Sequence, residues 1–407
     1  HSDNKMLTII ISRFKKMKYV YLLVLLFTFT CVQAQTKTDS ITLVPQTQIN
    51  AAQRLLSGNY ASAVTVGAYA EMLYNQPEGD NGELDVQRMV LLFGYRFNDK
   101  TQFVTEVELE HVNEVFVEQA FVNYSVGNNI SLRGGLMLVP MGIINEFHEP
   151  TTFNGTERPG MDNAIVPTTW REIGVGVAGR FNDINLGYQA YVFNGFKSTE
   201  ADGEGGLSGF LGGSSGLRGG RQKAIQSTID SPTLSTKLDY YGISGLRLGM
   251  STYFGKTQAA DDIETLEGAN IGIAMVGLDA RYAYDRFTAR GQFINASLSD
   301  TEEYNTATGR DLGSTLRGFY VEGAYNLLPM DKEQKLFVFT RYEQYDTHTD
   351  TEGSIVRNDA YNSTDVTTGL TYHLAPGVVL KGDYQFRSNA LENSDVDNRS
   401  NFGIGVW

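Results

Sequence analysis

Cysteine, proline and long apolar runs are what this sequence has least of. Its 407 residues include one cysteine, Cys31, and nine prolines, so no disulfide within the chain can hold the fold together. Apart from one short run near the start, no stretch suits a membrane helix. Basic residues are outnumbered by acidic ones, 33 to 47, which makes nucleic acid a poor partner. The 43 glycines, 22 tyrosines and 22 phenylalanines are instead typical of many strands joined by polar turns.

The one apolar run has the features of a secretory signal peptide. Met17 and the basic residue after it precede the apolar residues 19–29, and a small residue follows at Ala34. We assign residues 17–34 to the signal peptide and predict cleavage after Ala34. Two alternatives fit the run less well: a membrane anchor, which needs about 20 apolar residues, and a lipoprotein signal at Cys31, which prefers a smaller preceding residue than threonine.

The start of the chain contains two further segments. Residues 1–16 form an upstream extension, and the true start is Met6 or Met17. Cleavage would remove five basic residues and one acidic residue, so the mature chain would carry a formal charge of −18. Residues 35–60 are polar and are predicted to be a periplasmic segment with a short helix near residues 49–57.

From residue 61 onward, apolar and polar residues alternate with a period of two, which is the pattern of half-buried strands. In residues 103–110, for example, Val107 and Leu109 take one face while Glu106 and Glu108 take the other. The pattern predicts sixteen strands, at residues 64–74, 85–97, 103–110, 116–126, 130–138, 172–181, 184–193, 234–240, 246–255, 273–284, 287–296, 319–327, 336–345, 365–373, 380–387 and 402–407.

The links between these strands alternate in length. Even-numbered links are short, such as 98–100, whereas odd-numbered links are long, such as 139–170 and 194–232, with 111–115 the one short exception. A soluble sandwich or propeller, the main alternative, gives no reason to gather the long loops at one end. We predict an all-β transmembrane, antiparallel up-and-down β-barrel of about 16 strands over residues 61–407, with long outer loops and short periplasmic turns, in the outer membrane of a Gram-negative bacterium.

The two faces of such strands have different surroundings. On the lipid-facing side, an interfacial girdle is predicted for Tyr74, Tyr95, Tyr124, Tyr240, Tyr282, Tyr325, Tyr372 and Tyr384. The lumen wall is predicted to include Arg88, Arg96, Glu106, Glu108, Glu110, Arg133, Arg247, Arg281, Arg290, Lys381 and Asp383. Acidic and basic walls on opposite sides would produce a transverse field that orients solutes. Alternatively, these charges pair with one another and stiffen the wall.

One long segment, Val139–Trp170, breaks the alternation and contains four of the nine prolines. The sequences Val-Pro-Met-Gly at 139–142, Glu-Arg-Pro at 157–159 and Trp-Arg-Glu-Ile-Gly at 170–174 resemble the corresponding region of the phosphate-selective porin O and P family. The resemblance implies a sixteen-stranded outer-membrane barrel, often a homotrimer, that passes small hydrophilic solutes. It also implies an inward-folded loop that narrows the pore, and arginines and lysines that select anions.

In this chain the inward loop would be residues 139–170. By the resemblance, the pore constriction would contain Glu146, His148, Glu149, Glu157 and Arg158. Acidic residues outnumber basic ones in this loop, which favours a general or substrate-specific porin over a phosphate channel. We predict a passive diffusion channel for small hydrophilic solutes, anions among the candidates, in contact with outer-membrane lipids and lipopolysaccharide.

Two functions of other classes fit the same barrel. A plugged barrel would act as an adhesin or scaffold. An outer-membrane hydrolase would need a Ser-His-acid set at the outer rim, but His373 is expected at the periplasmic end, far from the Gly- and Ser-rich residues 209–216. The pair His148-Glu149 lacks a second histidine four residues on, so it is not the helical zinc motif. No catalytic residue, cofactor or metal ligand is predicted.

The last residue does not follow the strand pattern. Phe402, Ile404 and Val406 share the lipid-facing phase, and Trp407 falls out of it. The resemblance implies a final aromatic residue in that phase. We therefore expect the native chain to end one residue later.

Overall fold

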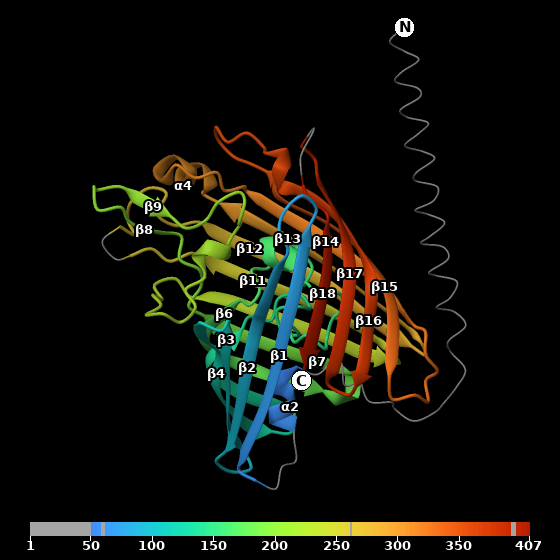
Figure 1. Cartoon of the computed structure of the whole chain (residues 1–407). Coiled ribbons are helices and arrows are strands. Elements are labelled where there is room, and N and C mark those ends of the chain that lie inside the picture. The colour runs from blue at the N-terminus through green and yellow to red at the C-terminus, as the bar shows by residue number, and fades with distance from the viewer. Residues whose placement is uncertain (1–49, 58–61, 261–262, 392–395) are drawn as a thin grey trace. The chain divides into compact units, whose positions relative to one another are not determined.

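Sixteen strands close into one antiparallel barrel in the computed structural model (Figure 1), which confirms the predicted fold. The predicted upstream extension and signal peptide lie outside the described residues, which are 50–57, 62–260, 263–391 and 396–407. The barrel strands are β1 (Val64–Pro77), β2 (Glu83–Arg96), β3 (Thr101–Glu110), β4 (Glu114–Gly127), β5 (Ile130–Leu138), β6 (Arg171–Phe181), β7 (Leu186–Phe193), β10 (Thr233–Ile243), β11 (Leu246–Lys256), β12 (Gly272–Tyr284), β13 (Phe287–Ser299), β14 (Thr315–Asn326), β15 (Lys335–Asp350), β16 (Asn362–Ala375), β17 (Val378–Asn389) and β18 (Arg399–Val406).

Neighbouring barrel strands follow one another along the chain, and β18 closes the barrel on β1. At this seam Tyr74 lies opposite Phe402. The loop between β7 and β10 contains a separate two-stranded sheet, β8 (Thr199–Ala201) and β9 (Leu207–Gly209). The described helices are α2 (Ala51–Ser57), α3 (Met161–Ala164) and α4 (Thr301–Thr308), with 3₁₀ turns η3 (Asn182–Ile184), η4 (Arg218–Gly220) and η5 (Asp359–Tyr361). None of them has the length and apolar character needed to cross a membrane.

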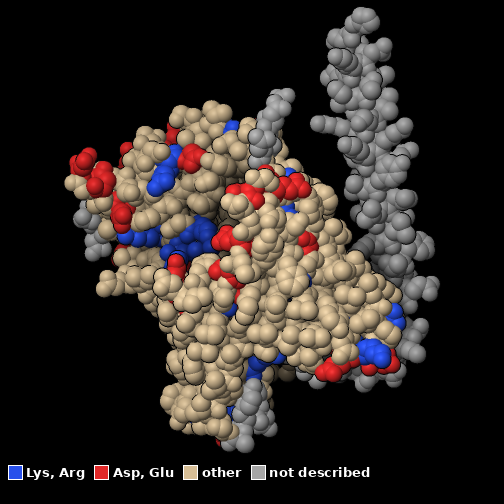
Figure 2. Space-filling view, in the orientation of Figure 1, with Lys and Arg blue, Asp and Glu red and all other residues tan. Residues whose placement is uncertain are grey.

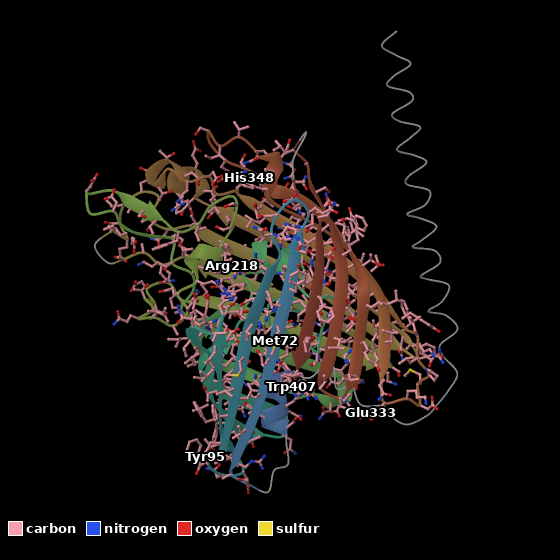
Figure 3. All side chains as sticks on the ribbon, in the orientation of Figure 1. Met72, Tyr95, Arg218, Glu333, His348 and Trp407 are labelled. Carbon is pink, nitrogen blue, oxygen red and sulfur yellow. The ribbon has the colours of Figure 1, made fainter. Side chains whose placement is uncertain are left out.

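Short turns and long loops lie at opposite ends of the strands. In Figure 3, Tyr95 and Glu333 mark the end with short turns, and Arg218 and His348 mark the end with long loops. The last residue, Trp407, lies on the short-turn side, where its amide donates to the carbonyl of Gly377 at 2.7 Å. The short-turn end is therefore the periplasmic end of the barrel.

The outer face of the barrel is apolar, as a surface in lipid requires. Along β4 and β10, for example, Val122 and Leu238 are 42% and 44% exposed. Five of the eight predicted girdle tyrosines are clearly exposed on this face: Tyr74, Tyr95, Tyr124, Tyr240 and Tyr325. In water such exposure would be unfavourable, but in a bilayer these side chains contact acyl chains and headgroups.

The inner face is not polar throughout, which the sequence analysis did not foresee. Toward the outer ends of β12 and β13, Met275, Ile294 and Leu298 point inward and are buried, whereas Ser297 faces outward and is exposed. β13 also continues three residues beyond its predicted end, to Ser299. Strand segments above the hydrocarbon layer have water outside and packed loops inside, so the apolar side of the strand is reversed there.

Candidate functional site: the inward loop and the outer cavity

Residues 139–170, the inward loop, fold into the barrel. All residues from 136 to 150 are buried. The two ends of the loop meet where the Val139 amide donates to the Trp170 carbonyl at 3.0 Å. The Asn145 side chain donates to both of their carbonyl oxygens, at 2.7 and 2.8 Å, and accepts from the Trp170 amide at 2.7 Å. These bonds fix the points where the loop leaves and rejoins the wall.

One side of the inward loop is tied to β10 and β13. The Lys237 ammonium, fully buried, donates to the Gly142 carbonyl at 2.5 Å and to the Glu146 carboxylate at 2.8 Å. The Ile143 amide donates to the Gln292 side chain at 2.5 Å. Gly142 has φ +65°, and a Cβ there would lie 2.5 Å from Gln292 Oε1. Glycine is therefore required at this close approach.

The opposite side of the loop is tied to β14 and β17. The Asn154 side chain donates to Glu322 at 2.9 Å, and Thr156 donates to Asp383 from its amide and its hydroxyl at 2.6 and 2.8 Å. The loop thus crosses the lumen from β10 to β17. Irregular backbone at membrane depth is stable here because wall side chains satisfy its polar groups.

His148, in the middle of the loop, meets three buried side chains of β1, β3 and β4. Its Nε2 lies 3.2 Å from Glu118 Oε2, 3.7 Å from Glu106 Oε1 and 3.1 Å from the Tyr69 hydroxyl. We call these four residues the His148 cluster. Burial alone would lower the pKa of His148, but the negative charges of Glu118 and Glu106 outweigh burial and raise the pKa to about 10.

Helix α2, the helix expected near residues 49–57, lies inside the periplasmic end of the barrel beneath the inward loop. The Ala51 amide donates to Glu149 at 2.6 Å. The Arg54 guanidinium lies 4.4 Å from the centre of the Trp407 ring, and that ring stacks on Tyr69 at 5.4 Å. The helix therefore narrows the same passage from below.

A cavity of about 580 Å³, the outer cavity, lies on the outer side of the inward loop. On the periplasmic side, the spaces beside α2 are only about 30 Å³ and 10 Å³. The basic residues lining the outer cavity are Arg88, Arg158, Arg171, Arg218, Arg221, Lys223, Arg341, Arg387 and Arg399. The acidic ones are Glu71, Glu108, Glu110, Glu114, Glu157, Asp162, Glu343 and Asp365.

Four of these basic residues, Arg171, Arg218, Arg221 and Lys223, form what we call the outer basic cluster. Figure 2 shows a basic area in a recess of the visible face, where Figure 3 labels Arg218. Within the described part of the chain, Arg218, Arg221 and Lys223 have no carboxylate at salt-bridge distance, and Arg171 has only Glu118 at 4.0 Å. Burial lowers the pKa of Arg221 and Lys223, and the neighbouring cations lower it further.

The outer basic cluster also holds the end of the inward loop. Arg218 donates to the Thr168 carbonyl at 2.8 Å, and Arg221 donates to the carbonyls of Pro167 and Thr169 at 3.0 and 3.2 Å. These contacts place the guanidinium groups beside the outer cavity. They leave other N–H donors of both arginines free for a solute, since a guanidinium carries five.

Five of the eleven predicted lumen-wall residues are paired with other charges of the wall, in line with the simpler sequence interpretation: Arg88, Glu108, Arg247, Arg281 and Arg290. The closest pairs, at 2.8 to 3.3 Å, are Arg88 with Glu71 and Glu108, Arg247 with Asp239, and Arg290 with Glu322. Arg281 lies 3.5 Å from Asp239. The others occupy separate places: Arg133 donates to Asn123 and Tyr191, Lys381 lies over the Phe153 ring, Arg96 lies near α2, and Glu110 lines the outer cavity.

Sequence reasoning missed Glu118 and the outer basic cluster. The register between β3 and β4 shifts after Glu106, so Glu118 and Gln119 both point inward, as in a β-bulge. Simple alternation cannot show this, although two adjacent polar residues within a strand are a hint. The basic cluster comes mainly from the neighbouring long loop, where Arg218, Arg221 and Lys223 stand close together in sequence.

A closed outer-membrane barrel with an inward loop and a polar outer cavity is the architecture of a porin, a class of outer-membrane channel. Residues 63–399 match the model of the family described as phosphate-selective porin O and P. The chain belongs to this family.

One relative by sequence and one solved structure are similar over most of this chain. An uncharacterized protein of Aquifex aeolicus (strain VF5) is 32% identical over 355 residues, which cover 82% of this chain and 78% of that protein. The outer membrane channel DcaP of Acinetobacter baumannii superposes with a TM-score of 0.55 at 12% identity, covering 85% of this chain and 98% of DcaP.

Two other solved structures have the same fold. An anion-selective porin from Comamonas acidovorans gives a TM-score of 0.53 at 13% identity over 84% of this chain and 98% of that porin. The trimer form of OmpT, an outer membrane protein of Vibrio cholerae, gives 0.53 at 11% identity over 85% of this chain and all of OmpT. At such identities the likeness concerns the fold alone.

Proposed function

We propose that this outer-membrane channel is a passive pore for small hydrophilic solutes, in which the inward loop forms the constriction and the outer basic cluster favours anions. No catalytic step is part of the proposal. The observation that carries it is the set of cations of the outer basic cluster beside the outer cavity, none of which has a carboxylate closer than 4.0 Å among the described residues. Sequence alone favoured a general pore, because the inward loop is acidic, but the cations come from the next long loop.

The charge balance of the cavity is decided by pairing rather than by number. Nine basic and eight acidic residues line it, which is nearly neutral. Glu71, Glu108, Glu157 and Glu343 are engaged in salt bridges with arginines. Six basic and four acidic lining residues take no part in these pairs, and the outer basic cluster supplies four of the six. Cations in a recess with low-dielectric walls attract anions and raise their local concentration.

Ion selectivity in planar bilayers tests the proposal. In a KCl gradient, the wild-type reversal potential should show a preference for chloride, and Arg218→Gln/Arg221→Gln/Lys223→Gln should shift it toward cations. The matched control Lys100→Gln/Lys332→Gln/Lys335→Gln removes the same charge from the short-turn end. Anion selection by the cluster would be refuted if both triple variants kept the wild-type reversal potential.

The proposal also covers the surroundings of the barrel. Its apolar outer face and tyrosines suit contact with outer-membrane lipids and lipopolysaccharide, after export by the signal peptide. We propose a homotrimer, supported by the trimer form of the OmpT fold. Cross-linking in native membranes should give a ladder that ends at three subunits, and a single monomer band would exclude the trimer.

A further inference from the structure

The His148 cluster is more elaborate than a constriction needs. Its four side chains are 0% to 1% exposed and come from three different wall strands and the inward loop. They bring together one imidazole, two carboxylates and one phenol. One carboxylate oxygen from each of Glu106 and Glu118 and one ring nitrogen of His148 all lie within 4.8 Å of one another. The imidazole and the carboxylates are donor types that bind divalent metal ions in proteins, and the Tyr69 hydroxyl donates to Glu106 Oε1 at 2.8 Å.

The histidine is oriented as a metal ligand. Its Nδ1 lies 3.2 Å from the Asn145 carbonyl oxygen. A carbonyl can only accept, so Nδ1 carries the proton and Nε2 presents its lone pair to the carboxylates when the ring is neutral. A backbone carbonyl on the far nitrogen is the usual partner of a metal-bound histidine.

The separations between the donor atoms suit a small metal ion. Nε2 lies 3.2 Å from Glu118 Oε2, 3.7 Å from Glu106 Oε1 and 3.1 Å from the Tyr69 hydroxyl. In a tetrahedral zinc site with bonds of about 2.0 to 2.1 Å, donor atoms are about 3.3 Å apart. Small adjustments of the side chains would therefore place all four donors around one ion.

The local charge also favours a divalent cation. Two buried carboxylates face one imidazole, and the nearest guanidinium, Arg171, is 4.0 Å from the other oxygen of Glu118. Of the other cations nearby, Arg88 is already paired with Glu71 and Glu108, and Arg158 donates to the His148 carbonyl at 3.0 Å. A neutral imidazole with one divalent ion balances both carboxylates, whereas a protonated imidazole balances only one.

Two further contacts complete the site. The Gln119 side chain donates to the second oxygen of Glu106 at 2.7 Å and so fixes that carboxylate. Glu108, which lines the outer cavity, lies close enough to Glu118 for the two carboxylates to interact electrostatically.

We propose that Glu106, Glu118 and His148, together with Tyr69, bind one Zn²⁺ ion that fastens the inward loop to β3 and β4. Sequence motifs do not show such a site, because Glu118 is 30 residues from His148 and enters the lumen through a β-bulge. The ion would act as a structural clamp, and the binding claim is independent of solute selectivity.

Isothermal titration calorimetry tests the binding directly. The purified full chain, folded in detergent and stripped with EDTA, should bind one Zn²⁺ per chain. His148→Ala should weaken binding at least ~100-fold and Glu118→Gln at least ~10-fold, since each removes a ligand or its charge. His348→Ala is the matched control, because His348 is also buried and hydrogen-bonded, to Asp311 and Asn358, and it should bind as the wild type does.

Folding is checked by the heat-modifiable gel mobility of each variant, and Glu118→Gln, which keeps the side-chain shape, covers the case in which His148→Ala fails to fold. Mg²⁺ titrated in place of Zn²⁺ should bind far more weakly, because Mg²⁺ prefers oxygen ligands in octahedral geometry. The proposal is overturned if the wild type binds less than a tenth of an equivalent of Zn²⁺, or if Glu118→Gln and His348→Ala bind equally well. The cluster would then be a proton-bridged ion pair only.

Discussion

The inward loop and the long loop after β7, residues 194–232, begin at the same end of the barrel but differ in how their charges are used. In the inward loop, Glu146 is bound to a buried lysine and His148 is enclosed by carboxylates. In the second loop, Arg218, Arg221 and Lys223 lie beside the outer cavity without a carboxylate at close range among the described residues. Under the proposed function, the first loop would set the pore shape and the second loop would set the ion preference.

The largest expected effect comes from breaking the inward loop's anchor. Lys237→Met removes the buried cation bound to Glu146 and to the Gly142 carbonyl. Loss of one partner of a buried ion pair costs about 3–5 kcal/mol, so we expect a lower thermal unfolding temperature and a larger, fluctuating single-channel conductance. The anion preference should change less than in the outer-cluster variant.

The exposed lysine at the outer end of β11 provides the control. Lys256→Met removes the same charge from an exposed side chain and should change neither conductance nor unfolding. Lys237→Met/Glu146→Gln removes both charges and should recover part of the lost stability. If Lys237→Met conducts and unfolds like the wild type, the inward loop does not set the pore size.

The sequence predicted the parts of this structure that depend on periodicity. Alternation along the strands and the alternating loop lengths gave the sixteen-stranded barrel and its orientation, and the proline-rich segment gave the inward loop. The length of 139–170 and its family motifs were visible because they are local in sequence.

The features that the sequence did not predict depend on contacts between residues far apart in the chain. A one-residue bulge turns Glu118 inward, and no period-two pattern contains that information. The apolar inner face near Ile294 exists because loops fill the outer half of the barrel. The charge of the cavity could not be read from the inward loop alone, because Arg218 and Arg221 reach it from a neighbouring loop.

An effect of intermediate size is expected on the pH dependence of stability, from Asp162, the buried carboxyl in α3. Burial raises its pKa to about 7, with Glu343 acting in the same direction and Gln292, Arg290 and Arg341 opposing the rise. A raised pKa means that the folded state favours the protonated carboxyl. Its contribution to the free energy of unfolding is complete below about pH 4, the pKa of an aspartic acid in the unfolded chain. The contribution is lost as the pH rises toward 7, by up to about 1.4 kcal/mol per pH unit.

Thermal unfolding measured between pH 4 and pH 8 would show this. The wild type should lose stability over that range relative to Asp162→Asn, which keeps the hydrogen-bonding shape without the charge. Asp162 also lines the outer cavity, so the chloride preference should be similar in both proteins only at about pH 4 to 5, where the wild-type carboxyl is protonated. Parallel pH curves for the two proteins would show that Asp162 does not control the docking of the loop.

The smallest expected effect is a pH dependence of the chloride preference caused by Lys223. It tests whether the second loop contributes to ion selectivity. Burial lowers the pKa of Lys223, and Arg221, Arg171 and Arg218 lower it further. A basic group with a lowered pKa loses its charge at a lower pH than a free lysine does, whose pKa is about 10.4. The chloride preference of the wild type should therefore decline at a lower pH than the titration of a free lysine would give, whereas Lys223→Arg should retain it further because arginine is the stronger base. Reversal potentials at pH 7, 8, 9 and 10 measure the difference, with Lys332→Arg at the opposite end as the control.

A wild-type preference that stays constant to pH 10 would mean that Lys223 does not contribute to ion selection, and the role would fall to the two arginines.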